Sequence, residues 1–221
     1  PTVYSGVALV MLTLPLLVKG IRGISALTEY LVPIMTAGYI ILSVAVLILR
    51  REALGEALLS IWRDAFTPAS AVGGVSGFLL SRALRVGTMR GLLSNEGGCG
   101  TAPTAHATSN EKSAAKQGMM GIVEVFVDTH ILCTLTALVL MVSWGDLVAR
   151  DGDFLSMTLS AYSAVLGRGA EVFMSVAIVL FGFATILCWG HYGRESVRAL
   201  SEKKWIGKGF LWVYAVSVVI G

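Results

Sequence analysis

Residues 90–106 read RGLLSNEGGCGTAPTAH. Gly97, Gly98 and Gly100 each weaken a helix by about 1 kcal/mol relative to alanine. Pro103 lacks the backbone donor of an ordinary residue, and its ring clashes with the preceding helical turn. The sequence therefore predicts that a helix is interrupted between Ser94 and Pro103.

The chain around this segment is apolar. Of its 221 residues, 55% are hydrophobic and 14% charged, and the mean hydropathy is +0.77, whereas a soluble domain is about 25% charged. Spanning a hydrocarbon core takes about 20 apolar residues. Such runs occur at 31–49, at 131–145 (from 118 if Glu124 and Asp128 are accommodated), at 172–192 and, shorter, at 3–18. We predict an all-α membrane protein.

The two ends of the sequence are abrupt. Pro1 is not an initiator methionine, and the apolar run 209–221 is too short to span a bilayer. We expect residues 1–221 to form a single transmembrane domain that is truncated at both ends. The spacing of Cys99, Cys133 and Cys188 fits no zinc or disulfide framework. The net charge of +3 is small and dispersed, which argues against a nucleic-acid partner.

Basic residues alternate between the segments that separate the apolar runs. Segments 19–30, 111–117 and 194–208 hold nine, whereas 50–68 and 145–171 hold five among several acids. The positive-inside rule makes the first set cytoplasmic. The alternation requires residues 69–110 to cross the membrane once, although Arg82, Arg85, Arg90 and Glu96 lie there.

Two interpretations of residues 69–93 stay open. They lie partly at the membrane interface with snorkelling arginines, or they cross as a segment that faces protein or water, where Glu96 neutralises Arg90.

The helix break between Ser94 and Pro103 also has two interpretations. If the break lies inside the membrane, its unpaired backbone groups must face protein, water or a ligand, and transporters use such breaks to bind carboxylates and sodium. If it lies at the membrane surface, it is an ordinary glycine-rich loop. It lacks the spacing of a phosphate loop.

The run 172–192 carries a stripe of small, hydroxyl and aromatic residues. Gly182, Thr185, Trp189 and Gly193 recur at helical spacing. This stripe fits a small amphipathic ligand, with Thr185 as its polar contact and Trp189 as a wall. Plain helix packing and an interfacial tryptophan explain it equally well.

The run that begins at Gly118 contains two carboxylates. Glu124 and Asp128 are four residues apart, on one face of an α-helix, beside a polar face of Thr129, Cys133 and Thr136. Intramembrane carboxylates usually mark an interior pathway, although Glu124 also fits the cytoplasmic end of a span. His106 and His130 are interpreted as structural, because no metal-ligand spacing accompanies them; no metal site is predicted.

RGLLSNEGGCGTAP at 90–103 resembles the RGLFSNEAGMGSAP signature of the sodium:alanine (amino acid:cation) symporter family. Further similar stretches follow in order: KGIRGISALTEYLVPIM at 19–35, AFTP at 65–68, QG at 117–118, DTHILCTLTALVL at 128–140 and FGFATILCWGHYGRE at 181–195. The resemblance implies a leucine-transporter-like fold with inverted repeats, of which this chain is a partial bundle, about helices 4 to 9. Helix 1 would be absent, so the fragment alone should not transport.

The resemblance also implies site residues. Thr185, Trp189 and Leu93, which replaces a phenylalanine, would contact the substrate, together with Asn95, Gly97 and Gly98 at the break. The Thr185 hydroxyl and the Phe181 carbonyl would bind sodium, although Ala184 stands where family members usually have serine. Glu96, Asp128 and Arg90 are candidates for a charge relay or polar network.

The predicted function is a secondary-active symporter of the plasma membrane, multi-pass in the bilayer, that takes up a small neutral amino acid, alanine or glycine, with sodium. No organic cofactor is expected, and Na⁺ is the coupling ion. A proton-coupled carrier using Glu96 or Asp128 and, less favoured, a channel are the alternatives. An enzyme is not expected, because Glu124, Asp128 and His130 form no nucleophile–base pair at diagnostic spacing.

Overall fold

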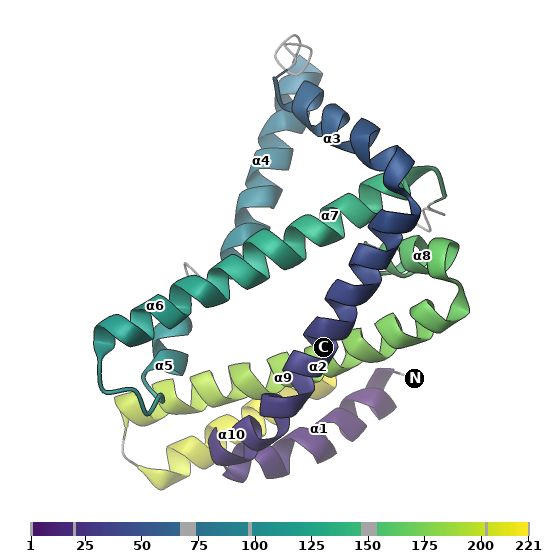
Figure 1. The fold of residues 1–221 in the computed structure, drawn as a ribbon. Coiled ribbons are helices and arrows are strands. Elements are labelled where there is room, and N and C mark those ends of the chain that lie inside the picture. The colour runs from purple at the N-terminus through teal and green to yellow at the C-terminus, as the bar shows by residue number, and fades with distance from the viewer. Residues whose placement is uncertain are drawn as a thin grey trace. The chain divides into compact units, whose positions relative to one another are not determined.

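The structure is a computed structural model that describes residues 2–19, 21–66, 74–96, 99–146, 154–201 and 203–220. These residues are helical or lie in short connections (Figure 1). The elements are α1 (Thr2–Lys19), α2 (Ile21–Leu49), α3 (Arg51–Phe66), α4 (Gly74–Ser94), α5 (Ala102–His106), α6 (Ala114–Val125), the π-helix η2 (Phe126–Leu132), α7 (Cys133–Val142), the 3-10 turn η3 (Trp144–Asp146), α8 (Phe154–Leu166), α9 (Arg168–Leu200) and α10 (Lys204–Ile220).

Three helical stretches in the described residues are long and apolar enough to cross a membrane. They are Thr28–Leu49, Ala114–Val142 and Arg168–Leu200, and they contain or closely match the predicted runs 31–49, 118–145 and 172–192. In the most apolar window of each, 17%, 11% and 22% of the residues are buried. Their apolar surface therefore faces outward, as expected where lipid or further helices cover it. The prediction of an all-α membrane protein is confirmed at this level.

The segments between the predicted apolar runs are partly helical. The segment 50–68 is largely α3, α8 occupies half of 145–171, and α2 begins at Ile21 within 19–30. Helix α3 packs on the core of the second unit through Ala57, with Ala53 and Leu54 beside it, while Glu52 and Glu56 are exposed. Residues 69–73 of the proposed crossing segment lie outside the described residues.

The chain divides into two compact units, which are described separately: Pro1–Ala37, Pro103–Thr108 and Val176–Gly221 form the first, and Gly38–Ala102 and Ser109–Ser175 the second. The expectation of one transporter domain stays a prediction. In the first unit α1 and α10 lie side by side (Figure 1). They approach closely at Gly6, where an added Cβ would lie 2.9 Å from the Val219 Cα.

The core of the first unit places α9 against both of these helices. Leu17, Ile24 and Leu187 are almost fully buried, with Leu211 and Tyr214 packed against them. The Tyr214 hydroxyl donates to the Ile186 carbonyl at 2.6 Å. These contacts hold the middle of α9 through its buried face.

The second unit has a larger core. Val46, Val139, Ala161, Tyr162 and Met174 are buried in it. Hydroxyl groups link its helices: Ser43 of α2 and Tyr162 of α8 are hydrogen-bonded at 2.7 Å, and Tyr39 of α2 bonds Thr136 of α7. Such pairing is required because a buried polar group without a partner is costly.

Candidate functional site

The predicted helix break is confirmed. Helix α4 ends at Ser94, and the amide groups of Asn95 and Glu96 donate to the carbonyls of Gly91 and Leu93 at 3.3 and 3.4 Å in a closing turn. Glu96 has a φ of 54°, a left-handed conformation in which helices commonly end. Gly100 follows with a φ of 72°, which glycine adopts without a steric penalty. Gly97 and Gly98 lie outside the described residues.

Two side-chain hydrogen bonds stabilise the end of α4. The Ser94 hydroxyl donates to an Asp128 carboxylate oxygen at 2.5 Å, and its oxygen lies 3.7 Å from the Cys133 sulfur. The Thr101 hydroxyl donates to a Glu96 carboxylate oxygen at 2.6 Å. Two of the network candidates, Asp128 and Glu96, therefore act as acceptors around the break.

The third network candidate contacts an aromatic ring. One of the two interpretations of residues 69–93 has Glu96 neutralise Arg90; in the structure the Arg90 guanidinium carbon lies 5.6 Å from the centre of the Phe154 ring. This is a cation–π contact. The carboxylate of Glu96 instead accepts the hydroxyl of Thr101.

Asp128 lies in a π-helix, which the sequence analysis missed. The segment Phe126–Leu132 widens the helix between α6 and α7, and single π turns are frequent at functional sites. Residues four apart lie near one face in an α-helix and in a π-turn alike, so the expectation that Glu124 and Asp128 share one face stays a prediction. Glu124 is exposed, whereas Asp128 is half-buried. His130 stacks on Phe126 with ring centres 5.4 Å apart.

The predicted stripe on α9 separates into two parts. At Gly193 an added Cβ would lie 2.3 Å from the tip of the Phe210 ring, so this glycine accommodates packing against α10. Gly182 has no described neighbour within 4 Å of such a Cβ. Thr185 is exposed, and Trp189 is 41% exposed. The part from Gly182 to Trp189 is thus left uncovered by the described residues.

The two predicted sodium ligands lie close together on α9. The Thr185 hydroxyl donates to the Phe181 carbonyl at 2.9 Å, one helical turn earlier. Two oxygen atoms at this separation can bind one cation once the hydroxyl hydrogen turns away. Ala184 is buried, with 8% exposure, so a serine at this position would add a hydroxyl to a packed face.

The predicted site residues fall in both units. Phe181, Thr185 and Trp189 belong to the first, and Arg90, Leu93, Asn95, Glu96 and Asp128 to the second. Leu93 is 58% exposed. Sequence reasoning missed Ser94 as the partner of Asp128, and Tyr214 as the donor to the Ile186 carbonyl. Ser94 could have been suspected, because it is the last hydroxyl before the break.

Long apolar helices together with a glycine-rich helix break are typical of membrane transporters. The model of the sodium:alanine symporter family matches residues 1–221, and the chain belongs to this family.

Three similar proteins show how the chain relates to longer members. It is 31% identical to an uncharacterized transporter, YflA, of Bacillus subtilis over 99% of the chain and 46% of that protein. It is 27% identical to the sodium/alanine symporter AgcS of Methanococcus maripaludis (98% and 46%) and 31% identical to the probable sodium/glutamine symporter GlnT of Bacillus subtilis (90% and 40%). The chain thus spans less than half the length of each.

Proposed function

We propose that the protein containing this chain is a multi-pass symporter of the plasma membrane that couples sodium entry to the uptake of a small neutral amino acid, alanine or glycine. Membership of the sodium:alanine symporter family supports the transport class and the coupling ion. The name of AgcS supports alanine, whereas that of GlnT makes glutamine the competing substrate. The proposal includes a leucine-transporter-like arrangement of inverted repeats.

One observation on the chain carries the proposal. The Thr185 hydroxyl and the Phe181 carbonyl lie 2.9 Å apart on a part of α9 that the described residues leave uncovered. In the proposal these oxygens bind sodium, Thr185 also contacts the amino acid, and Trp189 limits its side chain. Ser175 and Ser196 make the same kind of bond nearer the two ends of α9. The position of Thr185 near the middle of the helix and the family resemblance are what favour this pair as the cation contact.

The proposal assigns the broken segment to the same substrate. Leu93 would contact its side chain, and Asn95, Gly97 and Gly98 would supply backbone and amide groups to its polar end. Support comes from the observed end of α4 at Ser94, since interrupted helices free backbone groups for ligands. The carboxylates of Glu96 and Asp128 accept hydroxyl hydrogen bonds here, which favours a positioning role over direct contact with the substrate.

The test is uptake by the full-length protein in reconstituted vesicles. We expect a sodium gradient to drive uptake of radiolabelled alanine, with weaker uptake of glutamine. Thr185→Ala should lower the apparent sodium affinity by roughly tenfold or more, since hydrogen bonds and contacts to charged groups contribute about 1.5–3 kcal/mol. Thr185→Ser, which keeps the hydroxyl, is the matched control. Trp189→Ala should raise the half-saturating alanine concentration with sodium affinity unchanged.

Each alternative has its own signature. Uptake that persists without sodium but collapses when a pH gradient is abolished would establish proton coupling. Flux that does not saturate with substrate would indicate a channel. If Thr185→Ala and Trp189→Ala both transport with wild-type affinities, the assignment of α9 to the site is wrong.

A further inference from the structure

A hollow of about 300 Å³ lies where α9 turns into α10, in the first unit. Its lining includes Arg194, Arg198, Ser201, Lys203, Lys208 and Leu211. Four of these six side chains are cations, and none of the described lining residues is acidic. The hollow therefore has the charge of an anion site.

The surrounding sequence concentrates positive charge. Residues 194–208 hold five basic residues and two acidic ones, Glu195 and Glu202, a net charge of +3. The whole chain also has a formal net charge of +3. The remainder of the chain is thus neutral overall, and the excess charge lies at this turn.

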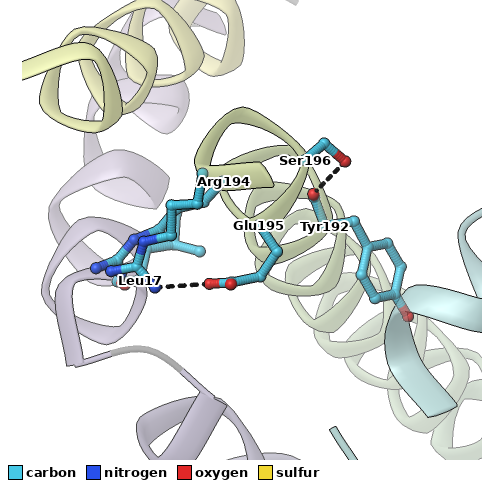
Figure 2. Close-up of polar contacts among 6 residues, drawn as sticks. Leu17, Tyr192, Arg194, Glu195 and Ser196 are labelled. Atoms are coloured by element: carbon cyan, nitrogen blue, oxygen red, sulfur yellow. Dashed lines mark hydrogen bonds and ion pairs between the residues drawn. The ribbon is translucent and has the colours of Figure 1, made fainter. Parts of the chain in front are cut away.

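Both arginines are held in place by contacts within the protein, and one of them, Arg198, is paired with a carboxylate. Figure 2 shows the Arg194 side chain reaching from α9 to α1, where it donates to the Leu17 carbonyl. Arg198 pairs with Glu195 at 2.8 Å, and its side chain is 52% exposed. A guanidinium has several N–H donors, so one contact leaves others available. Lys203 and Lys208 are exposed.

The chemistry of the lining favours a phosphate group. The planar fork of arginine matches phosphate oxygens, and lysine adds a compact charge. Leu211 supplies an apolar wall beside these cations. On α10, Trp205 and Trp212 are 70% and 72% exposed, and exposed tryptophans are typical of the membrane–water interface. A phosphate group bound at the membrane–water interface, beside two apolar helices, is most simply the headgroup of a lipid.

We propose that the α9–α10 hollow binds the phosphate headgroup of an anionic phospholipid. The lipid adds negative charge beside Arg198, Lys203 and Lys208, and its chains lie along the apolar surface of α10. The proposal requires insertion into a membrane but does not depend on which amino acid is transported. Its failure would leave the proposed transport function intact.

The test compares lipid binding by variants of the full-length protein. Native mass spectrometry would count bound phosphatidylglycerol and phosphatidylcholine on the wild type and on the triple variant Arg198→Gln, Lys203→Gln, Lys208→Gln. We expect the wild type to prefer phosphatidylglycerol and the triple variant to lose roughly a hundredfold in affinity, because each basic residue near an anionic lipid contributes about fivefold. Arg194 is kept, since it also contacts α1.

The matched control is Lys112→Gln with Lys116→Gln, two exposed lysines in a segment expected on the same membrane side. This variant should bind phosphatidylglycerol like the wild type. Arg198→Lys, which keeps the charge, should retain most of the binding and guards against a folding defect.

Three results would overturn the proposal. The triple variant could bind phosphatidylglycerol as well as the wild type does. The wild type could show no preference for phosphatidylglycerol, as expected if an acidic segment elsewhere in the protein fills the hollow. Inorganic phosphate at millimolar concentration could displace the lipid, which would mark the hollow as a site for soluble phosphate.

Discussion

Helix α4 ends in an irregular turn at Ser94, whereas α9 continues unbroken through Phe181 and Trp189. At the end of α4, polar atoms become available because the backbone leaves the helix, and the hydroxyl of Ser94 bonds the carboxylate of Asp128, 34 residues away. On α9 the backbone stays helical, and Thr185 bonds a carbonyl of its own helix. The two regions thus present polar groups in an apolar protein by different means.

The difference concerns what holds each region in place. The end of α4 is held by hydrogen bonds between side chains that are exposed or half-buried. The middle of α9 is held by packing of its opposite face against α1 and α10. Substitutions should therefore disturb the α9 region mainly through packing, and the α4 region mainly through hydrogen bonding.

The largest expected effect is on the packing of α1 against α10. In Gly6→Ala the new Cβ meets the backbone of Val219 at 2.9 Å, so α1 and α10 must separate. Overpacking of this kind costs about 2 kcal/mol, and the thermal unfolding midpoint of the full-length protein should fall. Gly87→Ala in α4, where an added Cβ has no described neighbour within 4 Å, is the control and should be neutral or slightly stabilising. Equal midpoints for the two variants would contradict the packing argument.

A smaller effect is expected where hydrogen bonds hold the end of α4. A double-mutant cycle with Ser94→Ala and Asp128→Asn should give a coupling energy of roughly 1.5 kcal/mol in unfolding, as for a hydrogen bond to a carboxylate. The same cycle with Ser94→Ala and Glu124→Gln is the control, since Glu124 precedes the π-helix. Additive effects in the Ser94–Asp128 cycle would show that this bond does not stabilise the break.

A third prediction separates packing from ion binding on α9. Tyr214→Phe removes the donor to the Ile186 carbonyl and should cost about 1 kcal/mol of stability. The sodium concentration for half-maximal uptake should not change, because the Thr185–Phe181 contact lies within α9. Tyr4→Phe, at a side chain that is 84% exposed on α1, should leave both quantities unchanged. A weaker sodium affinity in Tyr214→Phe would show that packing also sets the ion site.

The smallest expected effect is a gain. Ala184→Ser restores the hydroxyl that the family resemblance expects beside Thr185, on a helix face that is buried here. Sodium affinity should rise a few-fold in the full-length protein. Ala184→Val, which is larger but not polar, is the control for volume and should not raise it. Unchanged affinity in Ala184→Ser would mean that Thr185 and Phe181 bind sodium without this position.

The sequence by itself determined the properties that are local to a few residues. The apolar runs marked the three membrane-capable helices, because spanning depends on length and composition. The glycines and Pro103 marked the end of α4, because helix propensity is a property of the backbone at each residue. The family followed from the order of several motifs along the chain.

Only the tertiary structure decided which polar groups meet and which faces are covered. The Ser94–Asp128 bond joins residues that are 34 positions apart, and helical periodicity did not predict the π-helix around Asp128. The stripe on α9 has one periodicity, yet Gly193 packs against Phe210 while Thr185 stays uncovered. The charges near 194–208 predicted a membrane side, and the turn between α9 and α10 gathered them into a hollow. Helical periodicity determines on which face of a helix a residue lies, but the packing of the helices determines which element, if any, covers that face.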